Sequence, residues 1–126
     1  KRERVLAAIA DFSRRLQLTG WRVRVQFPRK GLDDALGECT VAPEYLEAVI
    51  SFDLKRLTGE NDDIERTVLH ELIHLHLWEL SDLAAKWAGE DPDRKEEVRK
   101  AEERAVSRMA SILEESWTRE GDDPEA

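Results

Sequence analysis

The sequence predicts an α+β fold, and three patterns along its 126 residues support that class. A helical pattern opens the chain, three short strand-like stretches follow it, and a nearly uniformly apolar helix precedes two further helical segments. Helices and strands segregated along a chain in this way are typical of a small sheet with helices on one face. We therefore expect one domain over residues 1–119 and a loosely held acidic tail over residues 120–126.

The N-terminal half is expected to supply one helix and all three strands. Residues 4–16 place apolar side chains at helical spacing, and Thr19-Gly20 ends that pattern. Residues 21–27 alternate apolar and polar side chains, as a half-buried strand does. Residues 36–41 and 48–53 are the second and third strands, the latter because of its Val, Ile and Phe. Together they predict a small antiparallel or mixed sheet.

The C-terminal half is expected to be helical. The segment from Ile64 to Leu80 is apolar on nearly all sides, which is typical of a buried central helix. Before it, Asn61-Asp62-Asp63 offers oxygens that can cap its first turn. A short helix is expected over residues 81–86 and a long one over residues 93–117, with a break between them at Gly89 and Pro92.

Composition narrows the possible partners and surroundings. Charged residues make up 38% of the chain and the formal net charge is −8, so nucleic acid is a poor partner. No apolar run approaches a membrane span, and we expect no membrane partner. The single cysteine, Cys39, excludes an internal disulfide, favours an intracellular setting and is expected to be a small buried hydrophobe. The four tryptophans lie on or beside apolar stripes, so they are expected to pack in the core.

The central helix contains the pattern His-Glu-x-x-His. His70 and His74 project from one face about one turn apart, where two imidazoles can hold one zinc ion. Glu71 stands beside the first of them, where a carboxylate can take a proton from a metal-activated water. The alternative is a hydrogen-bonded pair in the core, and we favour zinc. His76 lies about 200° round the helix from His74, so we expect it to be packed or hydrogen-bonded instead.

Catalytic zinc usually has three protein ligands and a water, so one ligand is still needed. Leu80 stands where a third histidine would mark one large protease group, which leaves a carboxylate. Glu102 is preferred because it lies within an apolar stripe, where an unpaired carboxylate is costly; a buried pairing with arginine is its alternative. Glu103 lies about 100° away and is expected to be solvated, and Asp82 is a weaker candidate. The stripe consists of Val98, Ala101, Ala105, Val106, Met109, Ile112, Leu113 and Trp117.

The stretch Thr67–Leu80, followed by Glu102-Glu103-Arg104-Ala105-Val106, resembles the zincin metallopeptidases. It is most similar to their small Glu-liganded forms, called minigluzincins. The order of Trp21-Arg22-Val23-Arg24-Val25, Cys39 and Tyr45 before the motif is similar to that of short metallopeptidases encoded in phages and bacterial genomes. A related likeness is to metallopeptidase-like domains that cleave or inactivate bacterial repressors.

The resemblance implies a zincin-like fold and a zinc-dependent hydrolase of peptide bonds. Its metal ligands would be His70, His74 and a downstream glutamate, and Glu71 would be the general base. It also implies that the strand at residues 48–53 lines the substrate cleft and pairs with an extended peptide. A peptide or protein substrate and the cytoplasm of a bacterial or phage-infected cell follow from the same likeness.

Two rival functions and one unassigned role stay open at this point. A zincin-derived domain that holds zinc and a partner without catalysis would be supported if Cys39 closed the fourth coordination position. A metal-free helical domain with an acidic surface rests on net charge alone. Tyr45, the only tyrosine, is a candidate to stabilise the oxyanion, although we favour a structural role for it as a half-buried residue.

Overall fold

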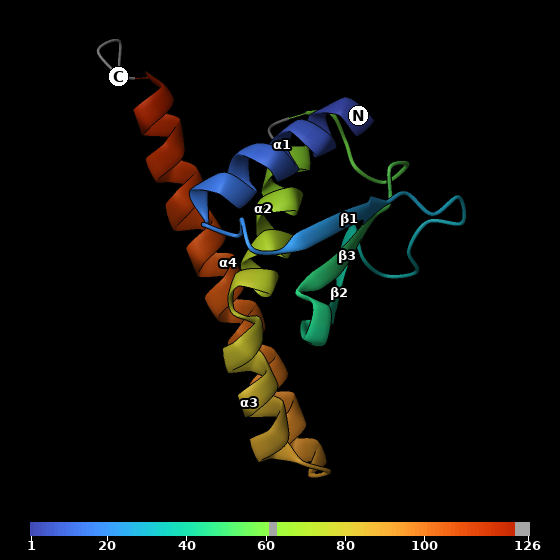
Figure 1. Cartoon of the computed structure of the whole chain (residues 1–126), viewed down its shortest axis with the longest axis vertical. Helices are drawn as coiled ribbons and strands as arrows, with labels where there is room; N and C mark the ends of the chain where they lie inside the picture. The colour runs from blue at the N-terminus through green and yellow to red at the C-terminus, as the bar shows by residue number, and fades with distance from the viewer. Residues whose placement is uncertain (61–62, 123–126) are drawn as a thin grey trace. The chain divides into compact units, whose positions relative to one another are not determined.

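The computed structural model describes residues 1–60 and 63–122, with side chains described as far as Trp117 (Figure 1). It divides into two compact units: the first spans Lys1–Trp78 and the second begins at Glu79. The described part of the chain contains four α-helices and a three-stranded mixed sheet, which confirms the predicted α+β class. Within those same ranges, no helix is long and apolar enough to cross a membrane.

The sheet belongs to the first unit and has the order β1-β3-β2. Strand β1 (Arg22–Gln26) is parallel to β3 (Glu47–Phe52), and β2 (Gly37–Ala42) is antiparallel to it. A single 3-10 turn, η1 (Pro43–Tyr45), connects β2 to β3. All three strands begin and end within one residue of their predicted bounds.

The register of the strands separates a core face from a polar face. On β3, Ala48, Ile50 and Phe52 are buried, and the residues between them are only half-buried. Because paired residues share a face, the same face carries Val23 and Val25 of β1 and Gly37, Cys39 and Val41 of β2. The opposite face carries exposed polar side chains, among them Arg24 and Thr40. The sheet therefore has one buried side.

The central place of β3 corrects one expectation. Residues 22–26 and 37–42 occupy both of its backbone edges, so β3 cannot pair with an additional extended peptide. The prediction that residues 48–53 pair with a substrate is therefore wrong. Strand β2 lies at the margin of the sheet and keeps one edge outside the ladder of the described strands.

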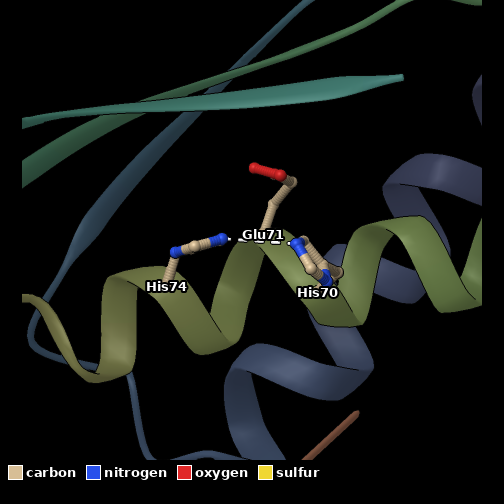
Figure 2. Close-up of side chains that lie close together, drawn as sticks. All are labelled: His70, Glu71 and His74. Carbon is tan, nitrogen blue, oxygen red and sulfur yellow. Dashed lines mark hydrogen bonds between the residues drawn. The ribbon is translucent and has the colours of Figure 1, made fainter. Parts of the chain in front are cut away.

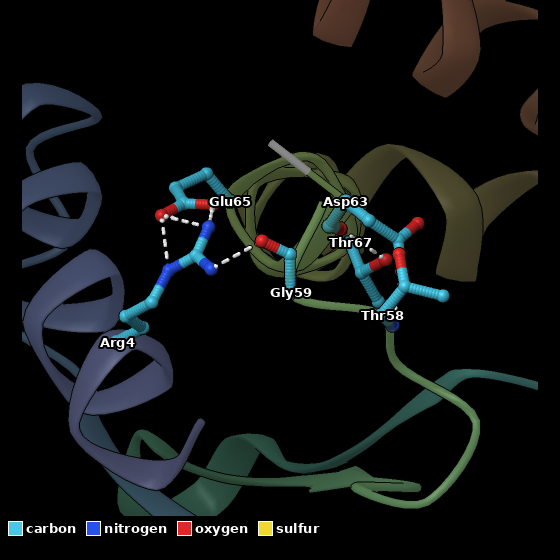
Figure 3. Close-up of polar contacts among 6 residues, drawn as sticks. All are labelled: Arg4, Thr58, Gly59, Asp63, Glu65 and Thr67. Carbon is cyan, nitrogen blue, oxygen red and sulfur yellow. Dashed lines mark hydrogen bonds and ion pairs between the residues drawn. The ribbon is translucent and has the colours of Figure 1, made fainter. Parts of the chain in front are cut away.

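Helices α1 (Arg2–Arg15) and α2 (Asp63–His76) complete the core of the first unit. Arg4 of α1 donates hydrogen bonds to both carboxylate oxygens of Glu65 on α2, at 2.7 and 2.9 Å, and to the carbonyl of Gly59 at 2.9 Å (Figure 3). This bidentate pair ties α1 to α2 and to the segment before it. The buried side chains of α2 are Ile64, Val68, Leu69, Glu71, Leu72, Ile73 and Leu75.

Asp63, the first residue of α2, also holds the loop that precedes the helix. Its carboxylate accepts hydrogen bonds from the backbone N–H and the hydroxyl of Thr58, at 2.9 and 3.3 Å (Figure 3). Its carbonyl accepts the hydroxyl of Thr67 at 2.9 Å. Asn61 and Asp62, the other predicted capping residues, lie outside the described residues.

The central helix is shorter than expected. It ends at His76, and α3 (Trp78–Ala88) begins two residues later, so the predicted continuation to Leu80 is wrong. Neither glycine nor proline stands at this break, and the apolar pattern runs straight through it, so no local signal reveals it. Trp78 packs edge-to-face on Trp21 with ring centroids 6.5 Å apart. Leu80 is 67% exposed and does not continue the buried face of α2.

The second unit consists of the rest of α3 and the long helix α4 (Pro92–Asp122). The Asp91 carboxylate caps α4 by accepting the backbone N–H groups of Asp93 and Arg94, at 2.9 and 3.3 Å. Helix α4 continues five residues past its predicted end, so the start of the expected tail is helical; residues 123–126 lie outside the described range.

Two expectations for the packing of this unit are wrong. Trp87 is 56% exposed, with the Arg94 guanidinium 4.9 Å from its ring centroid, rather than packed in a core. In the predicted stripe of α4, Val106 is fully buried but Ile112 is 65% exposed. Helical spacing identifies a candidate face, whereas the depth of burial depends on what covers that face.

Candidate metal centre

His70, Glu71 and His74 come together on α2 (Figure 2). Each offers one ligand atom, and these atoms lie within 4.8 Å of one another. The Nε2 atoms of the two histidines are 3.3 Å apart, and their rings are edge-to-face with centroids 4.9 Å apart. Both imidazoles are half-buried, whereas Glu71 is only 7% exposed. This group can hold a metal ion.

The separation of the two nitrogens fits a tetrahedral ion. Two imidazole nitrogens, each about 2.0–2.1 Å from a zinc ion with tetrahedral angles, lie about 3.3–3.4 Å from one another. The distance between Nε2 of His70 and Nε2 of His74 is 3.3 Å. The donor atoms therefore have the separation that one shared ion requires. In the structure this same contact is a hydrogen bond between the two rings, which is the alternative left open by the sequence.

Packing of its apolar side chains holds α2 in the core. Leu72, Ile73 and Leu75 are at most 1% exposed and anchor the helix in the core. Because successive residues turn by about 100°, this anchoring leaves His70 and His74 together on a partly open face. The Glu71 side chain rises from α2 toward the strands (Figure 2). The helix thus places two imidazoles where they can bind a metal, and it places the Glu71 carboxylate between α2 and the sheet.

Cys39 faces the same space from β2 and has a strongly raised pKa. Burial raises the pKa of its thiol to about 12, and the negative charge of Glu71 adds to the shift. Cys39 lies outside the group of residues that can share an ion in the described part of the chain, which supports the expected apolar role over that of a fourth ligand. Its side chain is half-buried rather than fully buried as expected.

The raised pKa predicts a slow thiol. At pH 8, below the pKa, nearly all of Cys39 is protonated, and a shift of three units from the ordinary 9.0 reduces the thiolate fraction by roughly 1,000-fold. We expect the metal-free protein to react with a disulfide reagent two to three orders of magnitude more slowly than a free cysteine peptide, with the rate rising steadily toward pH 11. A rate close to that of the peptide at pH 8 would contradict the assigned environment.

The predicted carboxylate ligands lie outside this group. Glu102 is half-buried and Glu103 exposed, both on α4 in the second unit. Asp82 on α3 forms an ion pair with Lys86 at 3.0 Å. Exposure of Glu103 agrees with its expected solvated role. Ligation by Glu102 stays a prediction.

Two further residues have surroundings that differ from those expected. His76 is exposed at the last position of α2, so the expected packed histidine is wrong. Its position as the final helical residue, beyond the last buried side chain, accounts for this. Tyr45 is 72% exposed on η1 rather than half-buried. The short turn between β2 and β3 leaves its ring uncovered.

Two residues were not predicted from the sequence: Gly37, which lies against Glu71, and Asp53, which holds the loop before β2. A Cβ atom on Gly37 would lie 2.9 Å from Cγ of Glu71, so the strand and the glutamate are in close contact. Asp53 is 5% exposed and accepts the backbone N–H of Leu32 at 3.0 Å, which holds the pKa of Asp53 below its usual range. The positive φ of Gly31 (71°) allows the chain to turn against that carboxylate. A glycine at the start of a strand was the only available signal.

Comparison with protein-family models, with curated proteins and with solved structures gave no significant match for this chain.

Proposed function

We propose that this protein is a zinc-dependent metallopeptidase with a zincin-like fold. The observation that carries the proposal is the pair of Nε2 atoms 3.3 Å apart on one face of a buried helix, with a buried glutamate between the two histidines in the sequence. Two imidazoles with this spacing can act as ligands of one tetrahedral ion. A carboxylate beside them can act as the general base in hydrolysis.

The roles of the residues follow from their chemistry. A zinc ion held by His70 and His74 would supply Lewis-acid chemistry: it would make a water more acidic and would polarise a carbonyl group. Glu71 accepts the proton of the attacking water and later gives it to the leaving amine. His70 and His74 fix the ion beside it.

The proposed binding path for the peptide follows β2. This strand is at the margin of the sheet and has backbone groups outside the ladder of the described strands. An extended peptide can add to such an edge through main-chain hydrogen bonds, which bind many sequences alike. Gly37 of β2 contacts Glu71, so a peptide on this edge would pass near the general base. This assignment replaces the rejected pairing with β3.

We propose Glu102 as the third protein ligand, as the sequence indicates. The matched test compares Glu102→Ala with Glu103→Ala, which removes the adjacent carboxylate. Zinc-loaded wild type and Glu103→Ala are expected to cleave unfolded casein into peptides detectable by mass spectrometry. Glu102→Ala and the chelator-treated wild type are expected to leave it intact.

Three results would count against this assignment. Cleavage by Glu102→Ala at the wild-type rate would exclude this glutamate as a ligand. Cleavage that survives removal of the metal would exclude the zinc mechanism. Intact casein in every zinc-loaded sample, the wild type included, would count against a general peptidase.

A further inference from the structure

We infer that Gly37 is a positioning residue for Glu71: its missing side chain leaves the space that sets where the glutamate carboxylate stands. The inference rests on the proposed role of Glu71 as general base. A Cβ atom at position 37 would lie 2.9 Å from Cγ and 3.3 Å from Cδ of Glu71. Carbon atoms approach one another comfortably only at about 3.5–4.0 Å. Any side chain at position 37 would therefore overlap with Glu71.

The strand cannot easily move away from the helix at this point. Gly37 stands opposite Phe52 in the β2–β3 ladder, and the backbone N–H of Asp53 donates to the carbonyl of Leu36 at 3.0 Å. A Cβ atom on Gly37 would also lie 3.4 Å from the ring of Phe52, whose side chain is fully buried. Both the backbone and the ring beside Gly37 are thus held by the core.

The loop before β2 is fixed as well. The Asp53 carboxylate accepts the N–H of Leu32 at 3.0 Å, and Nη1 of Arg56 donates to the carbonyls of Leu32, Asp33 and Ala35 at 3.2–3.5 Å. These bonds connect the segment that leads into β2 to the residues that follow β3. A shift of Gly37 away from α2 would have to break part of this network.

The helix backbone below is equally constrained. Val68, Leu72 and Leu75 are at most 1% exposed and hold α2 in the core. The strand and the helix are both held by the core. An atom added at position 37 is therefore expected to displace the Glu71 side chain by rotation about its own bonds. An alanine there would force the glutamate into another rotamer and carry its carboxylate away from the space beside His70 and His74 (Figure 2).

Crystal structures of the wild type, Gly37→Ala and Gly20→Ala, each grown with zinc chloride, test the inference. Gly20→Ala is the matched control, because nothing lies within 4 Å of a Cβ atom at that position. We expect Glu71 in a new rotamer only in Gly37→Ala, with His70 and His74 unmoved. Glu71 in its original rotamer in Gly37→Ala would overturn the inference, whether or not β2 has shifted. Zinc missing from every crystal would count against the proposed function, and the Glu71 rotamer would still decide the role of Gly37.

A solution measurement separates positioning from folding. Co²⁺ in place of zinc reports through its visible spectrum on the group that contacts its open position. We expect Gly37→Ala to bind as much Co²⁺ as the wild type, with a spectrum altered toward that of Glu71→Ala. On a cleavable peptide, kcat should fall by about 10- to 100-fold with KM unchanged.

If Gly37→Ala folds poorly, Gly37→Ala/Glu71→Ala should fold as well as Glu71→Ala, because the overlapping atoms are gone. A double variant that folds no better, or a wild-type Co²⁺ spectrum in Gly37→Ala, would overturn the inference.

Discussion

Glu71→Gln is expected to lower kcat for peptide hydrolysis by about 10²- to 10⁴-fold while the protein still binds zinc as the wild type does. Glutamine has nearly the same shape as glutamate, so it fills the space under Gly37 without new overlap. It cannot accept a proton, and the loss corresponds to about 3–5 kcal/mol of transition-state stabilisation. His70 and His74 are unchanged, so binding of the metal and chemistry are separated by one substitution.

Glu3→Gln is the matched control for this experiment. Glu3 is exposed in the first turn of α1 and belongs neither to the metal centre nor to the strand proposed to bind the peptide. The Glu3→Gln variant should leave the initial rate of hydrolysis, measured with a quenched fluorescent peptide, close to that of the wild type. Equal rates for wild type and Glu71→Gln would show that another group removes the proton.

The second large effect concerns the core that holds the motif helix. Leu72→Ala is expected to lower the free energy of unfolding by about 2–5 kcal/mol, because Leu72 is fully buried and its loss leaves a cavity. Leu6→Ala, on α1, removes the same atoms from a side chain that is 49% exposed, and it should cost well under half as much. Urea denaturation followed by tryptophan fluorescence gives both values. Equal losses for the two variants would contradict the assigned packing of α2.

Local patterns predicted the strands of the first unit well. Alternation of side chains indicated β1, and residues with high β-propensity indicated β3; all three strands begin and end within one residue of the prediction. The order of those strands was not predictable in the same way. That β3 lies between β1 and β2 depends on contacts between distant segments, and no short stretch of sequence records them. The wrong expectation that β3 binds a peptide arose because this strand order was not predicted.

The limits of periodicity also explain the errors in the helices. The break after His76 lacks a glycine or proline. The apolar pattern of residues 73–80 therefore predicts one helix, although these residues belong to two. Trp87 has the spacing of a core residue but lies mostly exposed beside Arg94. Periodicity states which face of a helix is apolar, and it does not state what covers that face.

The candidate site also combines contacts that are local in the sequence with contacts that are long-range. His70 and His74 are neighbours because a helix brings residues four apart onto one face, which is a local property. The contact between Gly37 and Glu71 joins a strand to a helix across 34 positions of sequence, so only the folded structure reveals it. Ligation by Glu102 is a long-range prediction of the same kind, and it stays one.

Zinc content, measured by elemental analysis on protein purified without a His tag and without chelator, tests the central claim most directly. The samples are the wild type, His70→Ala and His76→Ala; the last removes an exposed histidine of the same helix and serves as the control. One zinc per chain in the wild type and in His76→Ala, with none in His70→Ala, is the result expected from two imidazoles that share an ion. A wild type without metal after zinc is supplied, or full zinc content in His70→Ala, would contradict it.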